Sequence, residues 1–137
     1  MIRNWFTRDE QLKKTVDQLC VGAEQCFQAF RDGNLDKVAQ CVNEYWNLKK
    51  CMLPGNEPDF VKRLRTALQD GPIPMLCCSS LAGAGGGGFL YGLLAEGVSR
   101  EKFKSAFEAV EGSNDAEIIE AKLDYTGLTA SESPIID

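Results

Sequence analysis

Residues 73–94 decide the fold, and they read IPMLCCSSLAGAGGGGFLYGLL. Two apolar runs, residues 73–78 and 89–94, flank a segment of small residues. Short apolar runs bounded by glycine and proline are typical of strands. The stretch therefore predicts two strands joined by a glycine-rich connection.

The connection holds five glycines within residues 83–88. Each glycine costs about 0.4–1 kcal/mol relative to alanine, so five cost about 2–5 kcal/mol against a total stability of about 5–15 kcal/mol. Three interpretations would account for them: a flexible linker, a tight turn packed against another backbone, and an anion-facing turn whose N–H groups point into one concavity. Apolar runs on both sides disfavour the linker, and the sequence favours the anion-facing turn.

Two familiar phosphate-binding motifs do not apply to this connection. Gly83, Gly85 and Gly88 satisfy the pattern G-x-G-x-x-G, but a dinucleotide-binding fold requires a helix that opens at the third glycine. Residues 89–94 are instead apolar on all sides, and the next amphipathic helix begins only near Arg100. No G-x-x-x-x-G-K-[ST] sequence occurs in the chain, so a P-loop is excluded as well.

The N-terminal third predicts two helices. Thr7 and Glu10 match a capping box, and apolar residues at three-four spacing continue the first helix to about Arg31. Gly33 supplies a left-handed stop, and Asn34 is the expected N-cap of a second helix that extends past Trp46. The two helices should form an αα-hairpin. The apolar face expected for the first helix consists of Leu12, Val16, Leu19, Cys20, Ala23, Cys26, Phe27 and Phe30.

Shorter elements complete the prediction. Residues 60–68 should form a third helix that ends before Gly71, and Ser99 should cap a fourth helix with Gly112 as its stop. Alternating apolar and polar residues over 118–124 predict a half-buried third strand. The succession predicts a single α+β domain over residues 1–137, in which helices cover one face of an antiparallel sheet and an αα-hairpin precedes it.

Composition narrows the class of protein. The chain is 44% hydrophobic and 26% charged, as in ordinary globular domains, and its net charge is −5. This acidic balance argues against a nucleic-acid or anionic-membrane partner. No apolar stretch is long enough to span a bilayer and the N-terminus lacks a signal-peptide core, so a cytoplasmic location is expected.

Six cysteines and no histidine restrict the site chemistry. A Cys–His nucleophilic pair is impossible, and a zinc site would have to consist of thiolates alone. The cysteines occur at irregular spacings without a C-x-x-C pair, so no metal site is expected. We interpret all six as reduced, buried small hydrophobic residues.

Residues 81–91, LAGAGGGGFLY, resemble the third, C-terminal glycine-rich motif of GHMP kinases in the form seen in fucokinases and heptose kinases. Tyr45-Trp46, Lys49-Lys50, Pro54-Gly55 and Glu57-Pro58 are similar to the helix and turn that precede this motif in fucokinases. Heptose kinases often carry a lysine where Ser80 stands here. Fucokinases resemble this chain in having a serine at this position, and this resemblance favours L-fucose as the sugar.

The resemblance implies a ferredoxin-like C-terminal domain of a larger enzyme that transfers the γ-phosphoryl group of Mg-ATP to a sugar hydroxyl, yielding a sugar 1-phosphate in the fucokinase case. The family's phosphate loop and catalytic acidic residue belong to an N-terminal domain, so this chain would carry no catalytic residue and would be inactive alone. Its expected partners are that domain in cis and the sugar. The carried-over residues, expected to support the ATP and sugar cleft, are Gly83, Ala84, Gly85, Gly86 and Gly87.

Other candidate residues have simpler interpretations. We interpret Lys49 and Lys50 as charges that complement the dipole at the C-terminus of the second helix, in preference to contacts with phosphate or sugar. We interpret Tyr45 and Trp46 as core residues, in preference to residues that stack on a sugar. Asp124 is interpreted as a solvated surface group. An alternative function is a stand-alone, non-catalytic module of the same fold that binds a small ligand or a protein.

Overall fold

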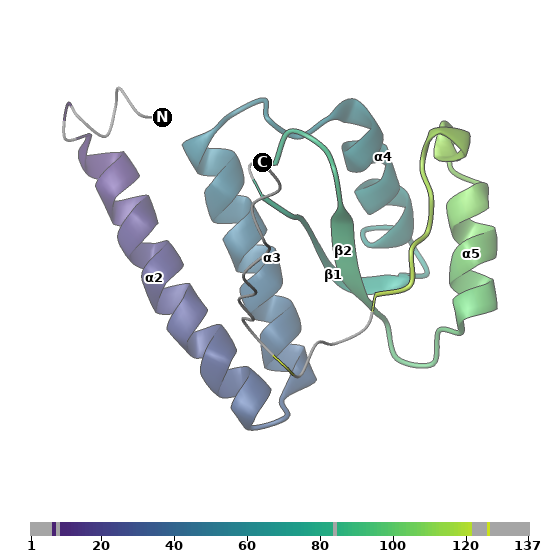
Figure 1. The fold of residues 1–137 in the computed structure, drawn as a ribbon, viewed down its shortest axis with the longest axis horizontal. Coiled ribbons are helices and arrows are strands. Elements are labelled where there is room, and N and C mark those ends of the chain that lie inside the picture. The colour runs from purple at the N-terminus through teal and green to yellow at the C-terminus, as the bar shows by residue number, and fades with distance from the viewer. Residues whose placement is uncertain (1–6, 8, 84, 122–125, 127–137) are drawn as a thin grey trace, which may run out of the picture.

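The computed structural model describes residues 7, 9–83, 85–121 and 126, and shows an α+β fold (Figure 1). Two long helices lie at one end, a two-stranded antiparallel sheet lies in the middle, and two shorter helices complete the other end. The α+β prediction is therefore confirmed. The elements in chain order are α2 (Glu10–Arg31), α3 (Leu35–Met52), α4 (Asp59–Leu68), β1 (Leu76–Leu81), β2 (Leu90–Leu94), α5 (Arg100–Glu108) and the 3₁₀ helix η1 (Ser113–Asp115).

The predicted αα-hairpin is confirmed by α2 and α3, which pack side by side. Gly33 adopts a φ of +67°, and the side chain of Asn34 accepts a hydrogen bond from the backbone N–H of Lys37 at 2.9 Å. The predicted capping box at Thr7 and Glu10 is wrong. Asp9 caps α2 by accepting from the N–H of Leu12 at 2.8 Å, and its carboxylate also complements the positive end of the helix.

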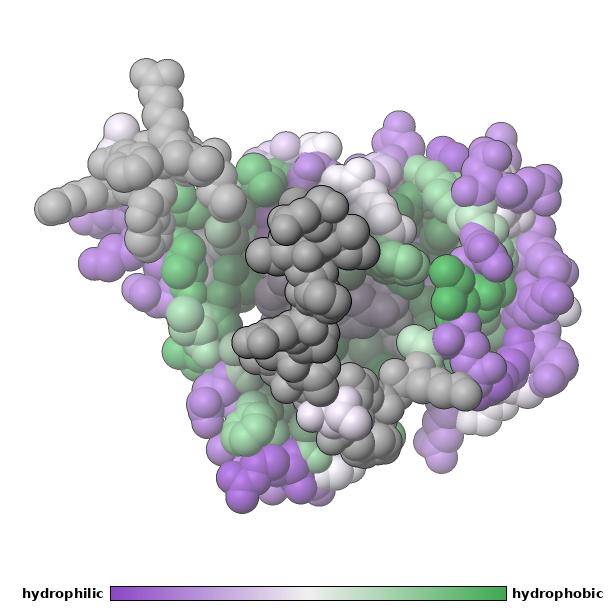
Figure 2. Space-filling view, viewed as in Figure 1, coloured by the Kyte–Doolittle hydropathy of each residue, from purple (hydrophilic) through white to green (hydrophobic). Residues whose placement is uncertain are grey.

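The predicted apolar face of α2 is only partly buried. Leu12 is buried, whereas Phe27 and Phe30 are 54% and 61% exposed. The reason is that α3 is the main neighbour of α2 and covers only a narrow stripe of it. Figure 2 shows apolar residues gathered along this end of the molecule, whereas the end formed by α5 is mostly hydrophilic.

The two strands pair in antiparallel register from Leu76 opposite Leu94 to Leu81 opposite Leu90, with an irregularity after Leu76. The first strand was predicted to begin at Ile73, but it begins at Leu76. Pro74 has no N–H to donate to a strand ladder, and Ile73 is 64% exposed. The strand also extends through two serines of the small-residue segment.

The third helix agrees with the prediction, and the fourth begins as predicted but ends earlier. The N–H of Lys102 donates to the hydroxyl of Ser99 at 3.2 Å, so Ser99 caps α5 as expected. The predicted stop at Gly112 is wrong, because α5 ends at Glu108 with Ala109 as its C-cap, and the left-handed Gly112 (φ +86°) precedes η1 instead. The core joins these helices to the sheet. One buried cluster consists of Leu64, Leu68, Met75 and Leu76, and a second consists of Trp46, Val61 and Leu81.

The predicted third strand is wrong for residues 118–121, where the structure shows no strand and Ile118 and Ile119 are exposed. In the described chain, this segment pairs with neither β1 nor β2. An ion pair of 3.0 Å between Arg100 and Glu120 joins it to the start of α5 instead. The rest of the predicted strand, residues 122–124 with Asp124, lies outside the described residues.

The interpretation of the cysteines is partly wrong. All six are free thiols, but only Cys41 and Cys78 are buried, whereas Cys20, Cys51 and Cys77 are exposed because they lie on the outer sides of their elements. Burial raises the pKa of the Cys78 thiol to about 11. Within the described residues, no helix has the length and apolar character needed to cross a membrane.

The Asn34 cap can be tested by Asn34→Ala, which removes the acceptor for the Lys37 N–H. We expect the free energy of unfolding, measured by urea denaturation, to fall by about 1 kcal/mol. Asn34→Asp keeps an acceptor and should stay close to the original chain. An equal loss in both variants would show that the side chain does not cap α3.

Candidate functional site: the glycine-rich loop and its platform

The glycine-rich loop is a hairpin connection between β1 and β2. The backbone N–H of Ala82 donates to the carbonyl of Phe89 at 2.8 Å, directly after the paired residues Leu81 and Leu90. A strand, β2, follows the glycines, so the rejection of a dinucleotide-binding fold is confirmed. Because both ends of the loop belong to one hairpin, the linker interpretation is wrong.

Backbone conformation explains most of the glycines. Gly83, Gly85, Gly87 and Gly88 have φ values of +70°, +97°, +138° and +86°, a region that residues with a Cβ atom rarely adopt. Gly86 is different, because its φ is not positive and an added Cβ would meet only the Asn56 side chain at 3.5 Å. Ala84, also predicted as a site residue, lies outside the described residues.

Gly85 is the point where the loop touches the rest of the domain. It is buried, and a Cβ atom there would lie 2.9 Å from Nδ2 of Asn56 and 3.4 Å from the Trp46 ring. Trp46 comes from α3, and Asn56 comes from the turn between α3 and α4. We call these two side chains the platform of the loop.

Lys49 provides a second contact. Its amino group donates to the carbonyl of Gly83, and it also lies 5.4 Å from the centre of the Tyr45 ring. Both Lys49 and Lys50 occupy the last turn of α3, as the helix-dipole interpretation requires. The contact with Gly83 was missed, because no local pattern connects residues that are 34 positions apart.

The platform rests on a buried ion pair. The indole N–H of Trp46 donates to Oε1 of Glu57 at 3.1 Å, and the same oxygen lies 3.1 Å from Nη1 of Arg65. The side chains of Arg65 and Glu57 are only 11% and 15% exposed, and the guanidinium lies 5.8 Å from the centre of the Trp46 ring. Core packing of Trp46 is thus confirmed. The same prediction for Tyr45 is wrong, because Tyr45 is 38% exposed.

A chain of polar side chains continues from Arg65 through the interior. Nε of Arg65 donates to the hydroxyl of Ser79 at 3.0 Å, and that hydroxyl donates to Gln69 at 2.6 Å. The Gln69 amide donates to Asn43 at 3.0 Å, and the Asn43 amide donates to the carbonyl of Cys77 at 3.1 Å. Every buried side-chain nitrogen and oxygen in the described residues has a partner. These contacts join α3, α4 and β1 beneath the loop.

The loop itself offers backbone donors. Among the described residues, the N–H groups of Gly85, Gly86, Gly87 and Gly88 have no hydrogen-bond acceptor. Free N–H groups in a glycine-rich turn are the kind of donor that binds anionic groups. The described residues also contain no cluster of three side chains that could hold a metal ion.

No family model matches this chain, and comparisons with curated proteins and with solved structures find no similar protein.

The close contact at Gly85 can be tested with two neighbouring substitutions. Gly85→Ala should lower the free energy of unfolding by about 1–3 kcal/mol, because alanine is strained at φ +97° and its Cβ would collide with Asn56. Gly86→Ala is the matched control and should change it by less than about 0.5 kcal/mol. Urea denaturation measures both. Equal effects at the two positions would contradict the described loop conformation.

Proposed function

We propose that this chain is the C-terminal domain of a GHMP-type sugar kinase, closest to fucokinase, whose complete enzyme transfers the γ-phosphoryl group of ATP to L-fucose. One observation carries the proposal. The two segments that resemble fucokinases, residues 45–58 and 81–91, meet in space: Trp46 and Asn56 lie against Gly85, and Lys49 binds the carbonyl of Gly83. Two similar segments that form one site support a shared function better than either segment alone.

The chemistry of the loop is consistent with a supporting role beside a phosphate. Gly85, Gly86, Gly87 and Gly88 present backbone donors, and the Lys49 ammonium adds a positive charge at the loop's start. These groups fit an anionic ligand and provide neither a nucleophile nor a general base. In the proposed enzyme, Mg-ATP and the catalytic acidic residue are held by the N-terminal domain, and the loop with residues 83–87 closes one side of the cleft.

The surface beside the loop favours a missing partner domain. Phe89 is 68% exposed, and Tyr91 and Leu94 of β2 are 47% and 39% exposed. In the described chain β2 pairs only with β1, so it is an edge strand there. An exposed apolar strand at an open sheet edge is typical of a surface that another domain covers. In the proposal this partner is the N-terminal kinase domain in cis.

A second candidate function is a stand-alone ligand-binding module. The observation that favours it is a separate cavity between α2 and α3, away from the platform. The two candidate functions make different predictions. A kinase requires a native protein larger than this chain and uses ATP, whereas a stand-alone module requires neither.

The proposal predicts the mass and activity of the native protein. An antibody raised against the chain should detect a species several times larger than 15.1 kDa in a native lysate. That species, once purified, should transfer phosphate from labelled Mg-ATP to L-fucose, whereas the 137-residue chain should not.

Two results would contradict the proposal. A native species of 15.1 kDa would favour the binding module, and phosphorylation of L-fucose by the chain alone would show that it is a complete enzyme. A large native species without sugar kinase activity would still support the presence of a further domain, but it would contradict the proposed phosphorylation of L-fucose.

A further inference from the structure

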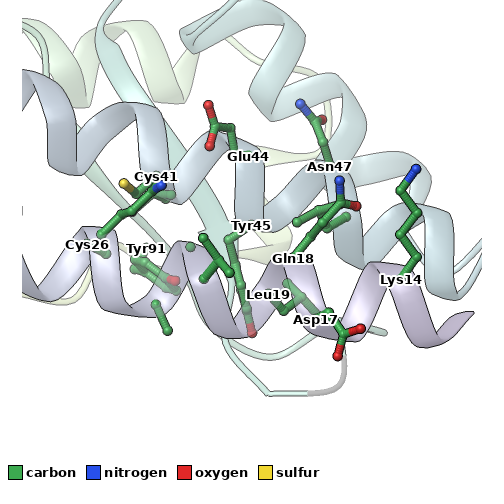
Figure 3. Close-up of a pocket in the computed structure, with 16 residues that line it drawn as sticks. Lys14, Asp17, Gln18, Leu19, Cys26, Cys41, Glu44, Tyr45, Asn47 and Tyr91 are labelled. Atoms are coloured by element: carbon green, nitrogen blue, oxygen red, sulfur yellow. The ribbon is translucent and has the colours of Figure 1, made fainter.

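A cavity of about 710 Å³ opens between α2 and α3 (Figure 3). Its walls come from these two helices and from Tyr91 of β2. Cavities of about 300–1,000 Å³ with mostly apolar walls are typical of small-molecule sites. Neither the glycine-rich loop nor its platform contributes a residue to this cavity.

The cavity lies beside the middle of α2. The buried residues of α2 are Leu12 and Thr15 near its start and Ala29 near its end. Between them, Gly22 lines the cavity, and a Cβ atom added there would meet no atom within 4 Å. Gly22 therefore contributes no side chain to the wall of the cavity.

The two ends of the cavity differ in chemistry. Cys26, Cys41 and Tyr91 lie at one end in Figure 3, and Lys14, Gln18 and Asn47 lie toward the other, where they have no hydrogen-bond or ion-pair partner within the described chain. Burial raises the pKa of Cys26, so its thiol stays protonated and acts as a small apolar group. The cavity is therefore amphipathic along its length.

Charge narrows the class of ligand. The lining contains two carboxylates, Asp17 and Glu44, against the single ammonium of Lys14, and the whole chain has a net charge of −5. An anionic head group would meet net repulsion at the polar end. Side-chain amides at Gln18 and Asn47 offer both donors and acceptors to an uncharged head.

We infer that this cavity binds a small, uncharged amphipathic molecule. Its apolar body would lie between Tyr45, Tyr91 and Cys41, and its hydrogen-bonding head would contact Gln18 and Asn47. This inference rests on the second candidate function, the ligand-binding module. The cavity shares no residue with the loop or the platform, although Tyr45 and Tyr91 belong to the two segments that resemble fucokinases.

Prodan, an uncharged naphthalene dye with a ketone group, serves as the probe, and its fluorescence is titrated against the full chain. We expect saturable binding at one site per chain. Gly22→Leu should weaken this binding by about tenfold or more, because the leucine side chain enters the cavity. Gly22→Ala adds only a methyl group and should keep the affinity within about threefold.

Three controls make the result decisive. Circular dichroism should show all variants folded, since alanine and leucine both favour helix over glycine. Gln11→Leu adds the same side chain at an exposed position of α2 outside the cavity and should bind the probe normally. The anionic dye anilinonaphthalene sulfonate should bind more weakly than prodan.

The inference is overturned by several outcomes. Absent saturable binding, or unchanged binding in Gly22→Leu, would exclude the cavity as the site. Tighter binding of the anionic dye would exclude the assigned ligand class. Sedimentation of the chain as a dimer that Gly22→Leu converts to monomers would show that a second copy, not a small molecule, fills the cavity.

Discussion

The buried guanidinium of Arg65 is the constraint on which the rest of the structure depends. It bonds to Glu57 and Ser79 and lies over the Trp46 ring, so one side chain of α4 joins α3, the turn before α4, and β1. Removing one partner from a buried ion pair leaves an uncompensated charge, which typically costs about 3–5 kcal/mol. The position of the platform therefore depends on this pair.

The glycine-rich loop inherits its conformation from the platform. Trp46 is fixed by Glu57, and Gly85 packs against the indole and against Asn56, where an added Cβ atom would lie only 2.9 Å from the Asn56 amide nitrogen. The hairpin base and the Lys49 contact hold the loop on either side. These contacts with the platform and with Lys49 help to offset the conformational cost of the glycines.

Several caps and turns were predictable from neighbouring residues, whereas side-chain contacts between distant residues were not. Asn34, Gly33 and Ser99 act through neighbours within three residues, so their roles follow directly from the sequence. Residues 118–121 of the predicted third strand show the limit of periodicity, because alternation indicates a strand only when a paired neighbour exists.

The sequence predicted which segment forms the candidate site, but it did not predict which residues of that segment contact the rest of the domain. The glycine run pointed to residues 83–87, yet nothing in it distinguishes Gly85, which contacts the platform, from Gly86, which has room for a side chain. The contacts of Arg65 with Ser79 and of Lys49 with Gly83 span 14 and 34 positions. Such polar pairs leave no periodic signal, and only the folded chain brings them together.

Hydrogen exchange at the Ala82 amide, which closes the base of the loop, tests this account most directly. Glu57→Gln removes the carboxylate that joins Trp46 to Arg65, and Glu120→Gln removes the exposed carboxylate paired with Arg100 as a matched control. The account predicts exchange faster by about tenfold or more in Glu57→Gln and by less than about threefold in Glu120→Gln. Equal exchange of Ala82 in the two variants would contradict the dependence of the loop on the buried pair.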